Sequence, residues 1–274
     1  MAAQPSRPIA LVTGASWGIG AGFAEHLARA GYDLVLVARR REVLDELAGR
    51  LSTEHGASAE VIAADLASEA GVTAVADRIG RGDIDLLVNN AGFGTSGEFA
   101  ELPLARELEE VDLNMRAVVR LSHAALRPML ARGRGGIINV ASTGAFQPVP
   151  YMATYAATKA FVLSFSEALH EETKGRGVTV TCVCPGPVRT AFQETAAIDS
   201  ERLPGWGWTS VDTVVRSALS AWKHGRALAI PGALNRATAV SATYSPRFLT
   251  RKIAGAMFRN ARKEQAQTPT NGQQ

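Results

Sequence analysis

Cysteine is scarce in this chain, and long apolar runs are missing. Among 274 residues the two cysteines are Cys182 and Cys184, at the end of an apolar run over 178–183 in which alternate residues share one face of a strand. No further cysteine or histidine is arranged around them, so we expect a buried, reduced pair and no metal site. No apolar stretch is long enough to span a bilayer, and the amino terminus has no signal-peptide pattern. We therefore expect a soluble, cytoplasmic protein.

The chain has room for one large α/β domain and no second catalytic domain, because 46% of its residues are hydrophobic but only 274 residues are available. It contains no internal repeat. Apolar runs of strand length alternate with helical patterns, which predicts βαβ units and a parallel sheet with helices on both faces. These runs cover 9–12, 34–37, 61–64, 84–88, 137–140, 178–183 and 228–230.

A glycine-rich turn follows the first of these runs. Gly14, Gly18 and Gly20 have the spacing G-x-x-x-G-x-G, and residues 21–30 then show helical spacing up to Gly31. In such a strand–turn–helix unit, glycines let backbone N–H groups approach a pyrophosphate, and the helix N-terminus adds partial positive charge. The turn therefore predicts a phosphate-binding site.

Tyr155 and Lys159 are four residues apart, a spacing that places both side chains on one face of a helix. Such pairs are common in helices. A tyrosine beside a fixed cation can, however, exchange a proton with an alcohol or ketone nearer to neutral pH than a free tyrosine can. The pair is therefore a candidate acid–base group.

Further motifs appear in order along the chain: Asp65, Asn-Asn-Ala-Gly at 89–92, Asn114, Ser142 and Pro185-Gly186. Together with the glycine turn and the Tyr155–Lys159 pair, they make residues 9–230 resemble a short-chain dehydrogenase/reductase. This resemblance implies a single-domain Rossmann-type fold, a doubly wound parallel sheet of about seven strands in the order 3-2-1-4-5-6-7. It places ligands at the carboxyl ends of the strands. It also implies hydride transfer between a nicotinamide and a carbonyl or alcohol.

The resemblance assigns catalytic roles to four residues. Tyr155 would be the acid–base group, and Ser142 would hold the substrate oxygen with it. Lys159 would bind the nicotinamide ribose and, with the nicotinamide cation, depress the tyrosine pKa. Asn114 would anchor a water beside Lys159 and complete a proton path to solvent.

The resemblance also assigns the cofactor contacts. Asp65 would accept a hydrogen bond from the adenine ring, although a plain helix N-cap before Ser68 is the alternative, and Thr190 would bind the carboxamide. The full predicted set is Gly14, Ser16, Trp17, Gly18, Ile19, Gly20, Arg39, Arg40, Asp65, Leu66, Asn90, Ala91, Gly92, Tyr155, Lys159, Pro185, Gly186, Val188 and Thr190.

The second strand ends without a carboxylate and is followed by Arg39, Arg40 and Arg41. A carboxylate there would repel the 2′-phosphate of NADP, whereas an arginine pairs with it. We therefore expect NADP(H) rather than NAD(H). Against this, Trp17 stands where many NADP-using relatives carry a basic residue, and the arginines can also be read as a solvated helix start.

The substrate is expected to meet a loop over 187–210 that carries Trp206 and Trp208. With the loop, Phe93, Phe146 and Met152 would line an apolar pocket that has Tyr151 at its rim. A hydrophobic ketone or a 3-oxoacyl compound would suit it. The alternative is that the two tryptophans only pack the loop against the rest of the protein and do not contact the substrate.

The net charge of +3 conceals a basic carboxyl-terminal region, because residues 213–263 hold ten Lys or Arg and no Asp or Glu. We expect the catalytic domain to cover 8–232, a basic helical extension 233–263 and a disordered tail 264–274. Over 246–263, Leu249, Ile253, Ala256 and Met257 share a predicted apolar helix face. That face would pack on its own domain, on a substrate as a lid, on a partner subunit or on anionic lipid.

Two other functions remain open at this point. A catalytically silent NADP(H) sensor would keep the glycine turn but would not need Asn114, Ser142, Tyr155 and Lys159 together. A nucleic-acid binder could use the basic region, but no nucleic-acid motif accompanies it, so we expect none. The expected partners are a small carbonyl or alcohol substrate and further copies of the chain in a dimer or tetramer.

Overall fold

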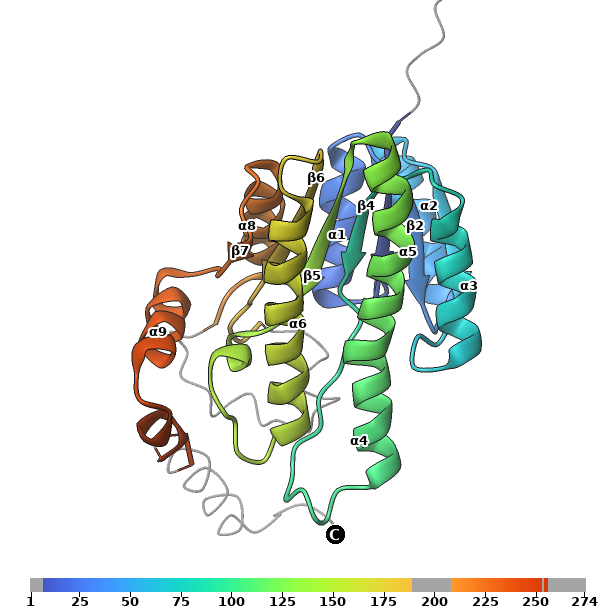
Figure 1. Ribbon diagram of the computed structural model, residues 1–274. Helices are drawn as coiled ribbons and strands as arrows, with labels where there is room; N and C mark the ends of the chain where they lie inside the picture. Colours follow the sequence, from blue (N-terminus) through green and yellow to red (C-terminus); the bar gives the residue numbers. More distant parts are fainter. Residues whose placement is uncertain (1–6, 189–207, 253, 256–274) are drawn as a thin grey trace, which may run out of the picture.

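A computed structural model describes residues 7–188, 208–252 and 254–255 (Figure 1). Seven parallel strands form one sheet in the order β3-β2-β1-β4-β5-β6-β7, which confirms the predicted order. The strands are β1 (Ile9–Thr13), β2 (Asp33–Ala38), β3 (Ala59–Ala63), β4 (Ile84–Asn89), β5 (Gly135–Val140), β6 (Val178–Val183) and β7 (Leu228–Ala229).

Helices cover both faces of the sheet because its central strands are apolar on both sides. In Figure 1, α3, α5 and α6 lie in front of the sheet, and α1, α2 and α8 lie behind it. Between the sheet and each layer of helices lies a separate cluster of buried side chains. Val12 and Leu36 belong to the cluster on one face, and Leu11 and Val35 to the cluster on the other. The helices are α1 (Gly18–Arg29), α2 (Arg41–His55), α3 (Glu69–Gly80), α5 (Ala117–Arg132), α6 (Ala153–Thr173) and α8 (Val211–Lys223).

Residues 104–132 form one continuous helix, but its hydrogen-bond pattern changes in the middle. It begins as α4 (Leu104–Val111), widens into a single π turn, η1 (Asp112–Arg116), and continues as α5. Asn114 lies in the π turn. Such turns interrupt the regular hydrogen-bond ladder and frequently mark functional sites.

After β7 the chain forms α9 (Ala233–Tyr244), followed by a further helical segment over 247–252 and 254–255. Of the predicted apolar face only Leu249 lies among the described residues; it is 42% exposed, whereas Thr250 and Ala254 are buried. What this face packs on stays a prediction. Ile253, Ala256 and Met257 lie outside the described residues, as do the predicted tail and most of the substrate loop.

Cys182 and Cys184 are both buried and free, with their sulfur atoms 3.8 Å apart. The described residues contain no group of three or more His, Cys, Asp or Glu side chains that could hold a metal ion. In the part of the chain that the structure describes, no helix has the length and apolar character needed to cross a membrane.

Candidate active site

The predicted motifs converge at the carboxyl ends of the central strands. The glycine turn follows β1, the Asn-Asn-Ala-Gly segment follows β4, and Ser142 follows β5. Ser142 begins a short 3₁₀ helix, η2 (Thr143–Phe146), and the chain then enters α6, whose first turns carry Tyr155 and Lys159. Residues far apart in the sequence thus meet at one edge of the sheet (Figure 1).

The glycine turn packs directly against the segment after β4. A Cβ atom on Gly14 would lie 2.8 Å from the Asn90 side chain, and Gly14 has a φ of +65°, which disfavours any other residue. The Thr13 hydroxyl accepts hydrogen bonds from the N–H groups of Asn90 (2.9 Å) and Ala91 (3.0 Å) and donates to the Val88 carbonyl. Thr13 belongs to the motif but was not predicted as a site residue.

The residues of this turn fit a dinucleotide. Helix α1 begins after Trp17, which makes no side-chain cap, and its first turn carries no acidic residue. The first N–H groups of any α-helix have no partner within the helix. In α1 no side-chain cap binds them and no acidic residue lies near them, so they are suited to bind a pyrophosphate. Ser16 and Ile19 lie beside the glycines of the same turn.

The adenosine end of the predicted site lies beyond β2. Arg39 and Arg40 are exposed there, and the Arg40 guanidinium lies 5.3 Å from the centre of the Trp17 ring, which is 54% exposed. Exposed arginines next to an open turn can pair with a 2′-phosphate.

Asp65 follows β3, and its side chain accepts a hydrogen bond from the Ala67 N–H (3.1 Å). The N-cap of α3 is Ser68, whose hydroxyl accepts from the Gly71 N–H, so the alternative that Asp65 is the cap is wrong. Asp65 is exposed and Leu66 beside it is buried.

The three proposed reacting side chains lie together. Lys159 is 5% exposed, its ammonium donates to the Val140 carbonyl (3.0 Å), and its Nζ lies 5.7 Å from the centre of the Tyr155 ring. The Ser142 hydroxyl accepts from the Gly144 N–H (3.1 Å) and also hydrogen-bonds with Tyr155. The chain thus brings a phenol, a hydroxyl and an ammonium to one point.

Burial dominates the titration of this group. It raises the pKa of Tyr155 to about 12, although the hydrogen bond with Ser142 opposes this shift. Burial also lowers the pKa of Lys159 to about 8. Among the protein's own residues, desolvation of the phenolate outweighs the hydrogen bond with Ser142. The depression of the tyrosine pKa by Lys159 together with a nicotinamide cation stays a prediction. Tyr155 is a protonated phenol at neutral pH.

Asn114 connects the π turn to the loop after β4. Its amide donates to the Phe93 carbonyl (2.8 Å) and to the Thr158 hydroxyl (3.1 Å), and its oxygen accepts from the Phe93 N–H (3.2 Å). A Cβ on Gly92 would lie 2.8 Å from that oxygen and 3.3 Å from Lys159 Nζ. Asn114, Gly92 and Lys159 are therefore neighbours, as the resemblance implies.

Two of the residues predicted to line the substrate pocket lie near the site. Phe93 and Met152 are buried, and the Arg106 guanidinium stacks 3.9 Å above the Phe93 ring. Tyr151 has a φ of +66°, an uncommon backbone for a non-glycine residue that often marks functional sites. Its carbonyl accepts from the Gly97 N–H (2.9 Å).

The Pro-Gly segment after β6 contacts η2, the chain before α8, and α9. The Pro185 carbonyl accepts from the Thr143 N–H, Val188 pairs with Thr209, and a Cβ on Gly186 would lie 2.4 Å from the Asn235 side chain. Asn235 lies in α9, so the extension packs against the Pro-Gly motif. Thr190 and Trp206 lie outside the described residues.

Sequence reasoning missed three buried polar groups near the site. Asn89, Ser122, Asn139 and Ser166 form a hydrogen-bonded chain beneath it. Asn235 supports the Pro-Gly segment, and Glu107 and Glu110 are buried on α4. Asn89 belongs to the predicted Asn-Asn-Ala-Gly motif, but its hydrogen bonds to Ser122 and Asn139 were not predicted. An asparagine inside an apolar strand is a signal that could have found Asn139, whereas charged residues in a polar helix give none.

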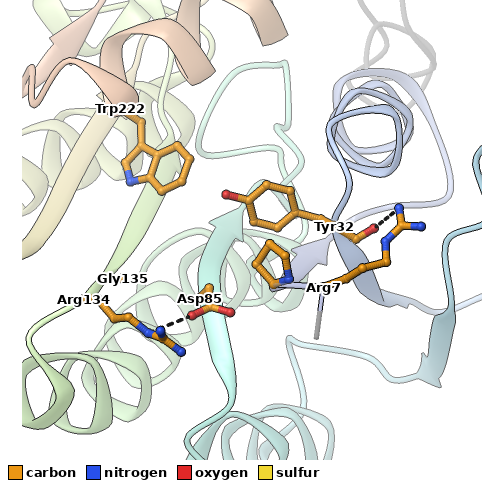
Figure 2. Close-up of a pocket in the computed structure, with 7 residues that line it drawn as sticks. Arg7, Tyr32, Asp85, Arg134, Gly135 and Trp222 are labelled. Atoms are coloured by element: carbon orange, nitrogen blue, oxygen red, sulfur yellow. Dashed lines mark hydrogen bonds and ion pairs between the residues drawn. The ribbon is translucent and has the colours of Figure 1, made fainter. Parts of the chain in front are cut away.

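A separate hollow of about 500 Å³ lies at the opposite, amino-terminal end of the sheet (Figure 2). Its charged side chains have partners, since Arg134 pairs with Asp85 and Arg7 donates to the backbone carbonyl of Tyr32. The hollow is lined by Arg7, Pro8, Tyr32, Asp85, Arg134, Gly135 and Trp222. It shares no residue with the candidate site.

Comparisons with known proteins identify the family and the fold of the chain. The family model described as short chain dehydrogenase matches residues 8–201. A very-long-chain 3-oxoacyl-CoA reductase from Anas platyrhynchos is 34% identical over 218 residues, 77% of this chain and 67% of that protein. A short-chain dehydrogenase from Sphingobium yanoikuyae in complex with NADPH is 34% identical with a TM-score of 0.79, covering 97% of this chain and 98% of that one. The bulky-bulky ketone specific alcohol dehydrogenase from Comamonas testosteroni is 31% identical with a TM-score of 0.75, covering 97% of each chain.

Proposed function

The chain belongs to the short-chain dehydrogenase family, and on that premise we propose that it is an NADP(H)-dependent reductase of a hydrophobic ketone or 3-oxoacyl compound. The family makes it an oxidoreductase that uses a nicotinamide cofactor and acts on carbonyl or alcohol groups. The observation that carries the proposal is the meeting of Ser142, Tyr155 and Lys159 beside an uncapped glycine turn.

The proposed chemistry needs a proton donor beside the substrate oxygen. A bound nicotinamide would supply hydride to the carbonyl carbon. Tyr155, whose pKa burial raises to about 12, is protonated at neutral pH and donates its proton to the developing alkoxide. Ser142 hydrogen-bonds the same oxygen. Asn114 donates a hydrogen bond to Thr158 on α6, and Asn114 and Lys159 both approach Gly92, so they connect α6 to the loop after β4.

NADP(H) is proposed over NAD(H) because β2 ends without a carboxylate and three exposed arginines, Arg39 to Arg41, follow it. The NADPH in the Sphingobium yanoikuyae structure supports this choice. The names of the two other relatives, a 3-oxoacyl-CoA reductase and a bulky-ketone dehydrogenase, support a large apolar carbonyl substrate. Buried Phe93 and Met152 beside the site agree with such a substrate.

The test is a panel of carbonyl compounds, from small ketones to long 3-oxoacyl thioesters, followed by the oxidation of NADPH or NADH. We expect turnover with NADPH that rises with the apolar size of the substrate. Tight NADPH binding without turnover of any compound would instead indicate a sensor.

We further propose a cytoplasmic homo-oligomer. Leu104 and Leu108 on α4 are 66% and 55% exposed, an apolar surface that a second copy would cover. Light scattering of the purified chain tests this, and a monomer at micromolar concentration would contradict it.

A further inference from the structure

Helix α9 exposes its apolar residues and buries a polar one. Four residues at helical spacing form an exposed apolar stripe along it: Ala233, Ala237, Val240 and Tyr244. The buried side of the helix holds Asn235 and Ala239. A helix on the surface of a globular protein normally does the reverse, because its apolar stripe packs on the core. The outward side of α9 therefore needs another explanation.

The Asn235 amide fixes which side of α9 faces inward. It donates hydrogen bonds to the Pro231 carbonyl (3.0 Å) and to the Thr209 hydroxyl (3.0 Å). The same side chain lies 2.4 Å from the position of a Cβ on Gly186. Turning the helix to bury its apolar stripe would break these contacts, so the apolar side stays exposed.

The exposed apolar residues continue into the helical segment after α9. Of the ten large hydrophobic side chains that are exposed among the described residues, five lie within residues 234–249. Single exposed apolar residues are normal, but a concentration of this kind marks an interaction surface. In Figure 1, α9 and the segment after it follow one another along one edge of the molecule. The five side chains, called the outer face below, are Leu234 (41% exposed), Val240 (48%), Tyr244 (85%), Phe248 (58%) and Leu249 (42%).

The charged residues beside the outer face are all basic. Residues 213–263 contain no Asp or Glu. Arg236 lies four residues before Val240, and Lys252 lies four residues after Phe248, so each base lies next to an exposed apolar side chain. Helices that lie in the surface of an anionic bilayer combine basic residues with exposed Phe and Leu in this way. The exposed bases of the two helices are Arg236, Arg247, Arg251 and Lys252.

The same charges disfavour a second copy of the chain on the outer face. In a two-fold dimer a surface packs on itself. That contact would bring the bases of two copies together, and residues 213–263 offer no acid to pair with them. Anionic lipid headgroups instead attract each lysine and arginine, and the acyl chains beneath them remove Phe248 and Leu249 from water.

We propose that the outer face binds the surface of an anionic lipid bilayer, with α9 and the helical segment after it lying in the plane of the interface. The apolar side chains enter the boundary between headgroups and acyl chains, and the basic side chains pair with the headgroups. The family model ends at residue 201, so the outer face is not among the features that identified the family. The proposal does not rest on the proposed reaction, and its test needs no substrate.

Co-sedimentation of the full chain with lipid vesicles tests the proposal. One set of vesicles contains three parts phosphatidylcholine and one part phosphatidylserine, and the other contains phosphatidylcholine alone. We expect the wild-type protein to sediment with the anionic vesicles only, and we expect added salt to release it because salt screens the charges. Failure to bind the anionic vesicles, or equal binding to both sets, would overturn the proposal.

Phe248→Ser should weaken binding to the anionic vesicles roughly tenfold to a hundredfold, as expected for an aromatic ring that no longer leaves water. Phe99→Ser is the matched control, because Phe99 is 60% exposed but lies in the turn before α4, and it should bind as the wild type does. Tyr244→Ser, at an 85% exposed residue, should also weaken binding and decides the case where Phe248→Ser does not fold. Wild-type binding in a folded Phe248→Ser or Tyr244→Ser protein would overturn the proposal.

Two further measurements separate the charges and the alternative partner. Lys252→Gln should weaken binding about fivefold, the contribution of one base near an anionic surface, whereas Lys223→Gln at the end of α8 should not. Light scattering without vesicles should give the same mass for Phe248→Ser and for the wild type. If Phe248→Ser reduced the mass, the outer face would join subunits, and the lipid proposal would fail.

Discussion

At the scale of single residues, the phenol of Tyr155 is the feature on which the proposed chemistry depends. Tyr155→Phe removes only the transferable proton, so we expect turnover to fall roughly a hundredfold to ten-thousandfold, the usual contribution of a general acid, while NADPH affinity stays within a few-fold. Tyr151→Phe is the matched control, because Tyr151 lies four residues earlier, before α6, and has no lysine four residues later. Steady-state rates and fluorescence titration of NADPH measure both effects. If Tyr155→Phe kept wild-type turnover, Tyr155 would not be the general acid.

The cofactor preference is also decided by individual side chains. Arg39→Asp should weaken NADPH binding roughly tenfold to a hundredfold more than NADH binding, because a charge-assisted contact of about 1.5–3 kcal/mol becomes a repulsion. Arg41→Asp makes the same charge change two residues later, at the first position of α2, and should spare NADPH. Dissociation constants for both cofactors measure this. Equal losses for the two cofactors would point to damaged folding, and no loss would place the 2′-phosphate elsewhere.

At the scale of elements, the turn between β1 and α1 depends on contacts that leave no space for a side chain. A Cβ on Gly20 would lie 2.1 Å from the Gly14 carbonyl oxygen, so we expect Gly20→Ala to destabilise the protein and weaken cofactor binding. Gly49 lies inside α2 with no atom within 4 Å of an added Cβ, and Gly49→Ala should stabilise the fold by up to about 1 kcal/mol. Thermal unfolding compares the two variants. A stable Gly20→Ala protein with normal cofactor binding would contradict this account of the turn.

The elements also show what the sequence could and could not predict. The strands, the glycine turn and the Tyr155–Lys159 pair were readable because their information is local, in apolar runs and short spacings. Glu107 and Glu110 were not readable, because α4 has the charge pattern of a solvated helix and becomes buried only through its packing on α6 and on the loop after β4. The π turn at Asn114 was hidden for the same reason, since its hydrogen bonds reach Phe93 and Thr158 from distant parts of the chain.

At the scale of the whole molecule, the buried carboxyl of Glu110 makes folding stability depend on pH. The pKa of Glu110 rises from an ordinary value of 4.5 to about 7 in the folded protein. Between these two values the folded chain holds a proton that the unfolded chain has lost, so the contribution of this group to stability falls as pH rises through the interval. The loss is on the order of 3 kcal/mol, since one pKa unit corresponds to about 1.4 kcal/mol.

We therefore expect the free energy of unfolding of the wild-type protein, measured in denaturant and compared with Glu110→Gln at each pH, to decrease between about pH 4.5 and pH 7 and then to level off. Glu110→Gln keeps the side-chain shape but cannot ionise, so the difference between the two proteins isolates the carboxyl. Glu101→Gln, at an exposed residue just before α4, is the matched control and should give a difference that does not change over the same range. A wild-type protein that became more stable than Glu110→Gln as pH rose would show that Glu110 is ionised in the fold, and that a cation balances its burial.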